Sequence, residues 1–121
     1  MSVVRCPKRG DVVWLDFTPQ AGHEQAGRRP AAVISHSEYN RKAGLMLACP
    51  ITNQRKGYPF EVSLPAGLAI TGVIQADQVR SLDWKSRRAA FIGHLDEETL
   101  AEVLSKLITL IDDGSGGVNP H

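Results

Sequence analysis

Short apolar runs separated by glycine, proline and polar residues make up most of the chain before residue 96. Residues 11–17 are rich in β-forming side chains and are bounded by Gly10 and Pro19, which is typical of a strand. Pro30 fits a strand only as its first residue, and Pro50 is expected to break the strand that contains it, because proline has no N–H to donate. We predict strands at 11–17, 30–35, 45–51, 59–64, 72–79 and 89–95. This spacing favours a compact antiparallel barrel or sandwich.

The last apolar segment has helical spacing. Its repeating positions are Leu100, Val103, Leu104, Leu107, Ile108 and Ile111. Asp96 is a good N-cap, and Leu95 and Leu100 occupy the two positions of a hydrophobic staple. Gly114 is expected to end the helix. The prediction is one mainly β domain over residues 1–113 with a C-terminal helix, followed by a flexible tail at 114–121.

Composition narrows the class of protein. The chain has 121 residues, the size of one domain, and no apolar run approaches the ~18 residues of a membrane span. It begins without the apolar stretch of a signal peptide, and Cys6 and Cys49 do not make a disulfide framework. We therefore expect a cytoplasmic protein with reduced thiols. The charge balance is +6 over residues 1–95 and −5 over 96–121, and a basic body is weakly indicative of an anionic partner.

Polar residues gather in the loop at 18–29, which carries His23, Glu24, Arg28 and Arg29. One interpretation is a solvated loop held by a local ion pair. The other is a metal-free site for cutting RNA, which needs a base for the 2′-OH, fixed positive donors for the phosphate and an acid for the leaving oxygen. The spacing of His and Cys matches no zinc motif, and no phosphate-binding P-loop is present. Metal-free acid–base chemistry or plain binding remains.

Two further clusters follow. Residues 52–58 offer a hydroxyl, amides, cations and an aromatic ring, which suits single-stranded nucleic acid or an ordinary hairpin loop. In residues 75–84, Asp77 and Asp83 either hold Arg80 or cap a turn. Trp84 is expected to pack in the core rather than stack on a base.

The three clusters, in this order, resemble the MazF/PemK family of toxin endoribonucleases. The matching segments are GDVVWLDFTP at 10–19, GHEQAGRRP at 22–30, PITN at 50–53, KGYPFEV at 56–62 and ADQVRS at 76–81. The resemblance implies an SH3-like antiparallel β-barrel with a C-terminal helix, working as a homodimer. It implies metal-independent, sequence-specific cleavage of single-stranded RNA without a cofactor, leaving a 2′,3′-cyclic phosphate and a 5′-hydroxyl. A cognate antitoxin with an acidic segment is the implied protein partner.

The resemblance also implies roles for individual residues. Arg29 and Thr52 fall on the catalytic arginine and hydroxyl of the family, and Glu24 on an acidic active-site residue. His23 and Asp77 match catalytic positions of PemK-type members. Those members carry an arginine where this chain has Gln75, which favours a MazF-type arrangement. The candidates for RNA contact are Gln25, Arg28, Asn53, Gln54, Arg55, Lys56, Gln78 and Arg80, with Arg28 also a candidate for the partner or dimer surface.

Two other functions stay open at this point. A toxin of the same fold poisons DNA gyrase by binding, through residues of the C-terminal helix, and a third possibility is an inactive member that only binds RNA. The helix here is followed by Asp112 and Asp113, whereas Arg29 and Thr52 keep their nuclease context, which favours the nuclease.

Overall fold

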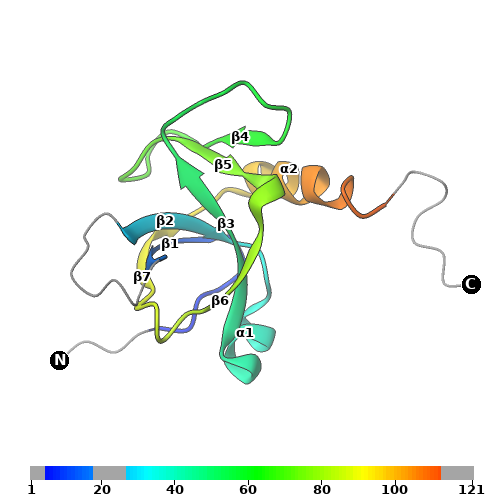
Figure 1. Cartoon of the computed structure of the whole chain (residues 1–121). Helices are drawn as coiled ribbons and strands as arrows, with labels where there is room; N and C mark the ends of the chain where they lie inside the picture. The colour runs from blue at the N-terminus through cyan, green and yellow to red at the C-terminus, as the bar shows by residue number, and fades with distance from the viewer. Residues whose placement is uncertain (1–4, 18–26, 113–121) are drawn as a thin grey trace, which may run out of the picture.

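The computed structural model describes residues 5–17 and 27–112 (Figure 1). Within these residues, seven strands form a sheet in the order β4-β5-β3-β2-β1-β7, with β6 added to β3, and all their pairings are antiparallel. The elements are β1 (Asp11–Asp16), β2 (Arg28–Val33), α1 (Ser37–Ala43), β3 (Leu45–Thr52), β4 (Glu61–Ser63), β5 (Val73–Gln75), the 3-10 helix η3 (Ala76–Gln78), β6 (Arg80–Asp83), β7 (Ala90–His94) and α2 (Glu97–Ile108). The predicted mainly antiparallel β fold with a C-terminal helix is confirmed. The sheet curls like a barrel, although within the described residues no pairing joins β7 to β4 to close it.

Strand β3 passes from one half of the fold to the other (Figure 1). Its first residues pair with β6 up to Ala48, and its last two, Ile51 and Thr52, pair with β5. Pro50 lies in the gap between these two ladders. No N–H is therefore needed on the side of β3 that faces β5 and β6. The prediction that Pro50 breaks the strand is therefore wrong, because the proline marks a change of partner within a continuous strand.

Pro30 is the third residue of β2, not its first as expected. The Phe17 N–H donates to the Gly27 carbonyl at 2.6 Å, so by the alternation of an antiparallel ladder Pro30 takes a non-hydrogen-bonded position opposite Trp14. On its other side, the pairing with β3 begins only at Ala31. Pro30 therefore removes no hydrogen bond from the ladder with β1, and it stands where the pairing with β3 ends.

The structure also corrects the segment predicted as one strand at 72–79. It contains β5, ending at Gln75, and then η3, which redirects the chain so that β6 pairs with the other half of β3. Strand β6 was not predicted as a strand. The strand expected at 59–64 is shorter, because β4 spans only Glu61–Ser63.

Helix α1 was not predicted, because a polar residue anchors it. Its only buried residue is Asn40, whose Nδ2 donates to the carbonyls of Pro7 and Ser35 at 2.9 and 3.1 Å. The Asn40 carbonyl accepts a hydrogen bond from Trp84 Nε1 at 2.8 Å. Trp84 is thus packed in the core, as expected. A helix held by a buried amide leaves no apolar period in the sequence.

Apolar side chains form two cores, one on each face of β1 and β2. Val12 and Ala32 belong to the core that α2 covers through Val103, while Val13 and Ala31 belong to the other core. The period-2 alternation of the strands separates these two sets. Helix α2 packs against β4 and η3 at the end of the sheet away from α1 (Figure 1).

The predicted start of α2 is confirmed and its predicted end is wrong. Asp96 is the N-cap and accepts a hydrogen bond from the Thr99 N–H at 3.3 Å, and the Thr99 hydroxyl is the main cause of the lowered pKa of Asp96. The helix ends at Ile108, before the expected Gly114, and Ile111 is 71% exposed. Gly114 and the predicted tail at 114–121 lie outside the described residues. No helix in the described part of the chain is long and apolar enough to cross a membrane.

Candidate functional site

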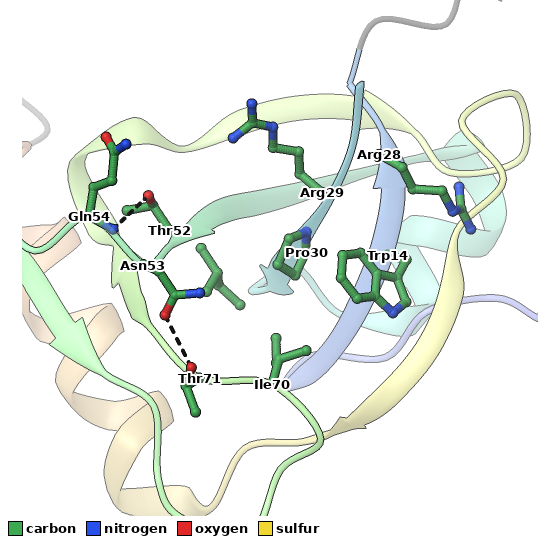
Figure 2. A pocket seen from close by; sticks show the side chains of 10 residues that line it. Trp14, Arg28, Arg29, Pro30, Thr52, Asn53, Gln54, Ile70 and Thr71 are labelled. Atoms are coloured by element: carbon green, nitrogen blue, oxygen red, sulfur yellow. Dashed lines mark hydrogen bonds between the residues drawn. The ribbon is translucent and has the colours of Figure 1, made fainter. Parts of the chain in front are cut away.

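A cavity of about 590 Å³ opens where β3 leaves β2 and joins β5 (Figure 2). Its lining combines hydrogen-bonding and charged side chains with apolar ones, and comprises Trp14, Arg28, Arg29, Pro30, Ile51, Thr52, Asn53, Gln54, Ile70 and Thr71. Because Pro30 ends the β2–β3 ladder, the two strands separate at this point. The cavity occupies the opening that results.

The strand register explains why Arg29 and Thr52 share this cavity. Ala31 pairs with Pro50, so two residues further along each antiparallel strand the same register leads to Arg29 and Thr52. Both follow the face of the sheet that carries Ala31 and Ala48. Figure 2 shows the exposed Arg29 side chain at the edge of the cavity on the side of Thr52 and Gln54. These two residues are the ones for which the family resemblance implies the central catalytic roles.

Local hydrogen bonds fix the polar groups that follow β3. The Thr52 hydroxyl accepts the Gln54 N–H at 3.1 Å, and the Thr71 hydroxyl donates to Asn53 Oδ1 at 3.1 Å (Figure 2). Gly72 makes this close approach possible, because its φ is +135° and a Cβ there would lie 2.6 Å from the Thr52 carbonyl oxygen. Asn53 and Gln54, predicted from the sequence, are thus in the cavity.

Sequence reasoning missed Trp14, Ile70, Thr71 and Gly72 as parts of the site. The alternation of β1 turns Trp14 to the face opposite Val13, not to the face that Arg29 and Thr52 follow, so it gave no signal for Trp14. Thr71 and Ile70 had none, because only the pairing of β5 with the end of β3 brings them to the cavity.

Arg28 and Arg29 are adjacent but have different surroundings. Arg28 lines one edge of the cavity, while its guanidinium donates to Asp16 Oδ1 and to the Arg88 carbonyl, each at 2.9 Å. Figure 2 shows this guanidinium on the opposite side of the view from Thr52 and Gln54. Its contacts are structural ones within the chain.

The loop after Gln54 is ordered by Glu61, which the sequence did not single out. The Glu61 carboxylate accepts the N–H groups of Lys56 and Gly57 at 2.9 and 3.1 Å. Arg55 donates to the Ser63 hydroxyl at 2.9 Å, and the Lys56 ammonium lies 5.9 Å from the centre of the exposed Tyr58 ring. Among the described residues, Arg55 and Lys56 flank the cavity rather than line it.

The third predicted cluster lies elsewhere. Asp77 and Gln78 are exposed on η3, and Arg80 stands over the Phe17 ring at 5.2 Å, so the described lining of the cavity includes none of these three. Asp83 caps a turn by accepting the N–H groups that follow it, as one of the two interpretations predicted.

Burial, with a smaller contribution from Asp77, raises the pKa of Cys49 to about 12, so this thiol stays protonated and inert at neutral pH.

His23, Glu24 and Gln25 lie outside the described residues. A backbone hydrogen bond joins Phe17 and Gly27, the residues on either side of the segment 18–26. Over residues 5–17 and 27–112, no group of three or more His, Cys, Asp or Glu side chains is arranged to hold a metal ion.

Known proteins share both the sequence and the fold. Residues 8–111 match the family model of the PemK-like, MazF-like toxin of type II toxin–antitoxin systems. The endoribonuclease toxin MazF of Escherichia coli K12 is 48% identical over 105 residues, covering 87% of this chain and 94% of that protein. The crystal structure of MazF from Deinococcus radiodurans (Form-I) matches with a TM-score of 0.80 and 57% identity, covering 88% of this chain and 97% of that one. A MazE–MazF structure (Form-III) from the same organism matches with a TM-score of 0.81 and 54% identity, over 88% and 97% of the two chains.

Proposed function

The chain belongs to the PemK-like, MazF-like family of toxins from type II toxin–antitoxin systems, and from this premise we propose that it is an endoribonuclease that cleaves single-stranded RNA. The observation that carries the proposal is the shared cavity of Arg29 and Thr52, with the amides of Asn53 and Gln54 beside them. A guanidinium offers paired donors to phosphate oxygens, and amides offer donors and acceptors to base edges.

The chemistry divides among these groups. Arg29 binds the scissile phosphate and stabilises the charge that grows on its oxygens, and Thr52 orients one of those oxygens. A base in the segment 18–26, either Glu24 or His23, takes the proton of the 2′-OH. The 2′-oxygen then forms a bond to phosphorus as the bond to the 5′-oxygen breaks. The products are a 2′,3′-cyclic phosphate and a 5′-hydroxyl once the leaving oxygen is protonated. Asp77, on η3, has no part in this scheme.

We propose two protein partners. The MazE–MazF structures from D. radiodurans support a cognate antitoxin, and the acidic segment of such a partner would compete with RNA for the basic groups around Arg29. The second partner is another copy of this chain in a homodimer, in the cytoplasm.

Incubation of the pure protein with a long single-stranded RNA in excess EDTA tests the activity. We expect cleavage to persist, with 5′-hydroxyl ends on the fragments, because the described site offers Arg, Thr and amide groups rather than a carboxylate cluster for Mg²⁺. Activity that disappears with EDTA and returns with Mg²⁺ would contradict the mechanism. Intact RNA together with inhibited DNA gyrase would instead support the gyrase-binding function, and bound but uncut RNA would identify a binding protein.

A further inference from the structure

Asp16 lies at the end of β1, directly opposite Arg28 at the start of β2. Its carboxylate accepts hydrogen bonds from Arg28 Nη1 at 2.9 Å and from Arg88 Nε and Nη2 at 2.8 and 3.4 Å. These hydrogen bonds, that of Arg88 above all, lower the pKa of Asp16 below its usual range. We call Asp16, Arg28 and Arg88 the Asp16 cluster, in which one ionised carboxylate bridges two guanidinium groups.

The backbone of Arg88 is unusual. Its φ is +53°, in the left-handed region, which is unfavourable for a residue with a Cβ. The conformation is fixed by contacts on both sides, since the Arg88 N–H donates to the Lys85 carbonyl at 3.0 Å and the Arg88 carbonyl accepts from Arg28 Nη2 at 2.9 Å. A strained backbone persists where the surrounding structure over-determines it.

The same turn holds the end of β1 through a second arginine. Arg87 Nη1 donates to the carbonyls of Asp16 and Phe17 at 3.0 and 2.9 Å, and the Asp16 N–H donates to the Arg87 carbonyl at 2.9 Å. Phe17 is in turn bonded to Gly27. The residues on both sides of segment 18–26 are therefore attached to the turn between β6 and β7.

We propose that Asp16 and Arg88 are positioning residues for RNA cleavage: they hold the Arg28 guanidinium apart from Arg29 and Thr52. This inference rests on the proposed function. Alternation along β2 starts Arg28 and Arg29 on opposite faces, and the Asp16 cluster keeps them apart. Arg29 is then the guanidinium of the pair that meets the phosphate.

Asp16→Asn tests this by separating turnover from binding. The change removes the charge that holds both guanidinium groups, so we expect kcat at saturating RNA to fall about tenfold or more, since small misplacements of catalytic groups have large effects. Binding is measured with RNA whose 2′-O-methyl groups prevent cleavage. Released Arg28 adds a phosphate contact, so affinity should not weaken, and the slope of log K against log salt should steepen by about 0.7.

Two variants control the experiment. Glu38→Gln adds the same charge change on α1, where Glu38 pairs only with the exposed Lys42 in the described structure, and it should leave kcat and the salt slope unchanged. The double variant Asp16→Asn/Arg28→Ala should return the salt slope to the wild-type value, because the added contact is Arg28 itself.

The outcomes are distinguishable. A wild-type protein that cuts RNA, with an Asp16→Asn variant equal to it in kcat and in salt slope, would overturn the inference. Equal losses of kcat and affinity in Asp16→Asn would overturn it too, because they would indicate a merely structural role. A wild type that binds RNA without cutting it would contradict the proposed function, while the salt slopes would still test the placement of Arg28.

Discussion

The two edges of the cavity are built in different ways. At the Thr52 edge, backbone segments approach closely, and Gly72 lets the Thr71 hydroxyl reach Asn53. At the Arg28 edge, charged side chains are bonded to one another and to backbone carbonyls. The first edge is shaped by the close approach of backbone, whereas the second uses guanidinium donors to hold the structure. We therefore expect the two adjacent arginines to have different tasks.

The strongest test of this comparison removes one arginine at a time. Arg29→Ala should reduce the cleavage rate by about a hundredfold to a thousandfold, or about 2.7–4 kcal/mol, because it removes a donor directed at the transition state. Arg29 is exposed, so the unfolding midpoint should stay near that of the wild type. The measurements are single-turnover cleavage and thermal unfolding of Arg29→Ala and of its control, Arg28→Ala.

Arg28→Ala is the matched control, with the same loss of charge. It should lose much less activity, and a loss equal to that of Arg29→Ala would show that the two arginines act alike on RNA.

The sequence predicted one edge better than the other. Arg29, Thr52, Asn53 and Gln54 could be named because they sit in short motifs, and the structure brings them into one cavity. The different surroundings of Arg28 could not be predicted from the sequence. Its hydrogen-bond partners, Asp16 and Arg88, lie 12 and 60 positions away, and only the fold brings them together.

The fold shows the same limit. Period-2 and helical patterns located most strands and α2, since burial on one face repeats along the sequence. Helix α1 was missed because the buried group that anchors it is Asn40, and β6 was missed because the turn at η3 depends on tertiary contacts. Pattern analysis finds elements that bury apolar faces and overlooks those held by polar contacts.

A smaller effect is expected from the backbone at the Thr52 edge. Gly72→Ala combines an unfavourable φ with a Cβ 2.6 Å from the Thr52 carbonyl oxygen, so Thr52 and Gly72 must move apart. We expect a loss of unfolding free energy of about 2–3 kcal/mol, at the upper end for one strained residue, with reduced cleavage because Thr52 and Asn53 shift. Urea unfolding measures the stability.

Gly67→Ala provides the comparison for that variant. Gly67 has a φ of +101°, and a Cβ there would meet nothing within 4 Å, so its substitution carries the backbone strain alone. It should cost about 1 kcal/mol. Equal losses in the two variants would mean that close packing against Thr52 is unimportant.

The smallest expected effect concerns acid and the Arg28 edge. The pKa of Asp16 is lowered in the folded protein, chiefly by the hydrogen bond from Arg88, so its stabilising contribution is complete above the usual pKa of 3.8 and is lost as the pH falls through the folded value. Since the Arg88 side chain is 69% exposed, solvent screening limits that contribution to about 1 kcal/mol. Asp16→Asn should therefore be less stable than the wild type at pH 7 by about this amount, and the gap should close as the pH drops below 3.8. Urea unfolding of both proteins at several pH values measures the gap. A gap that stayed constant into acid would show that the carboxylate contributes through packing rather than charge, and the two edges of the cavity would then differ less than their hydrogen bonds indicate.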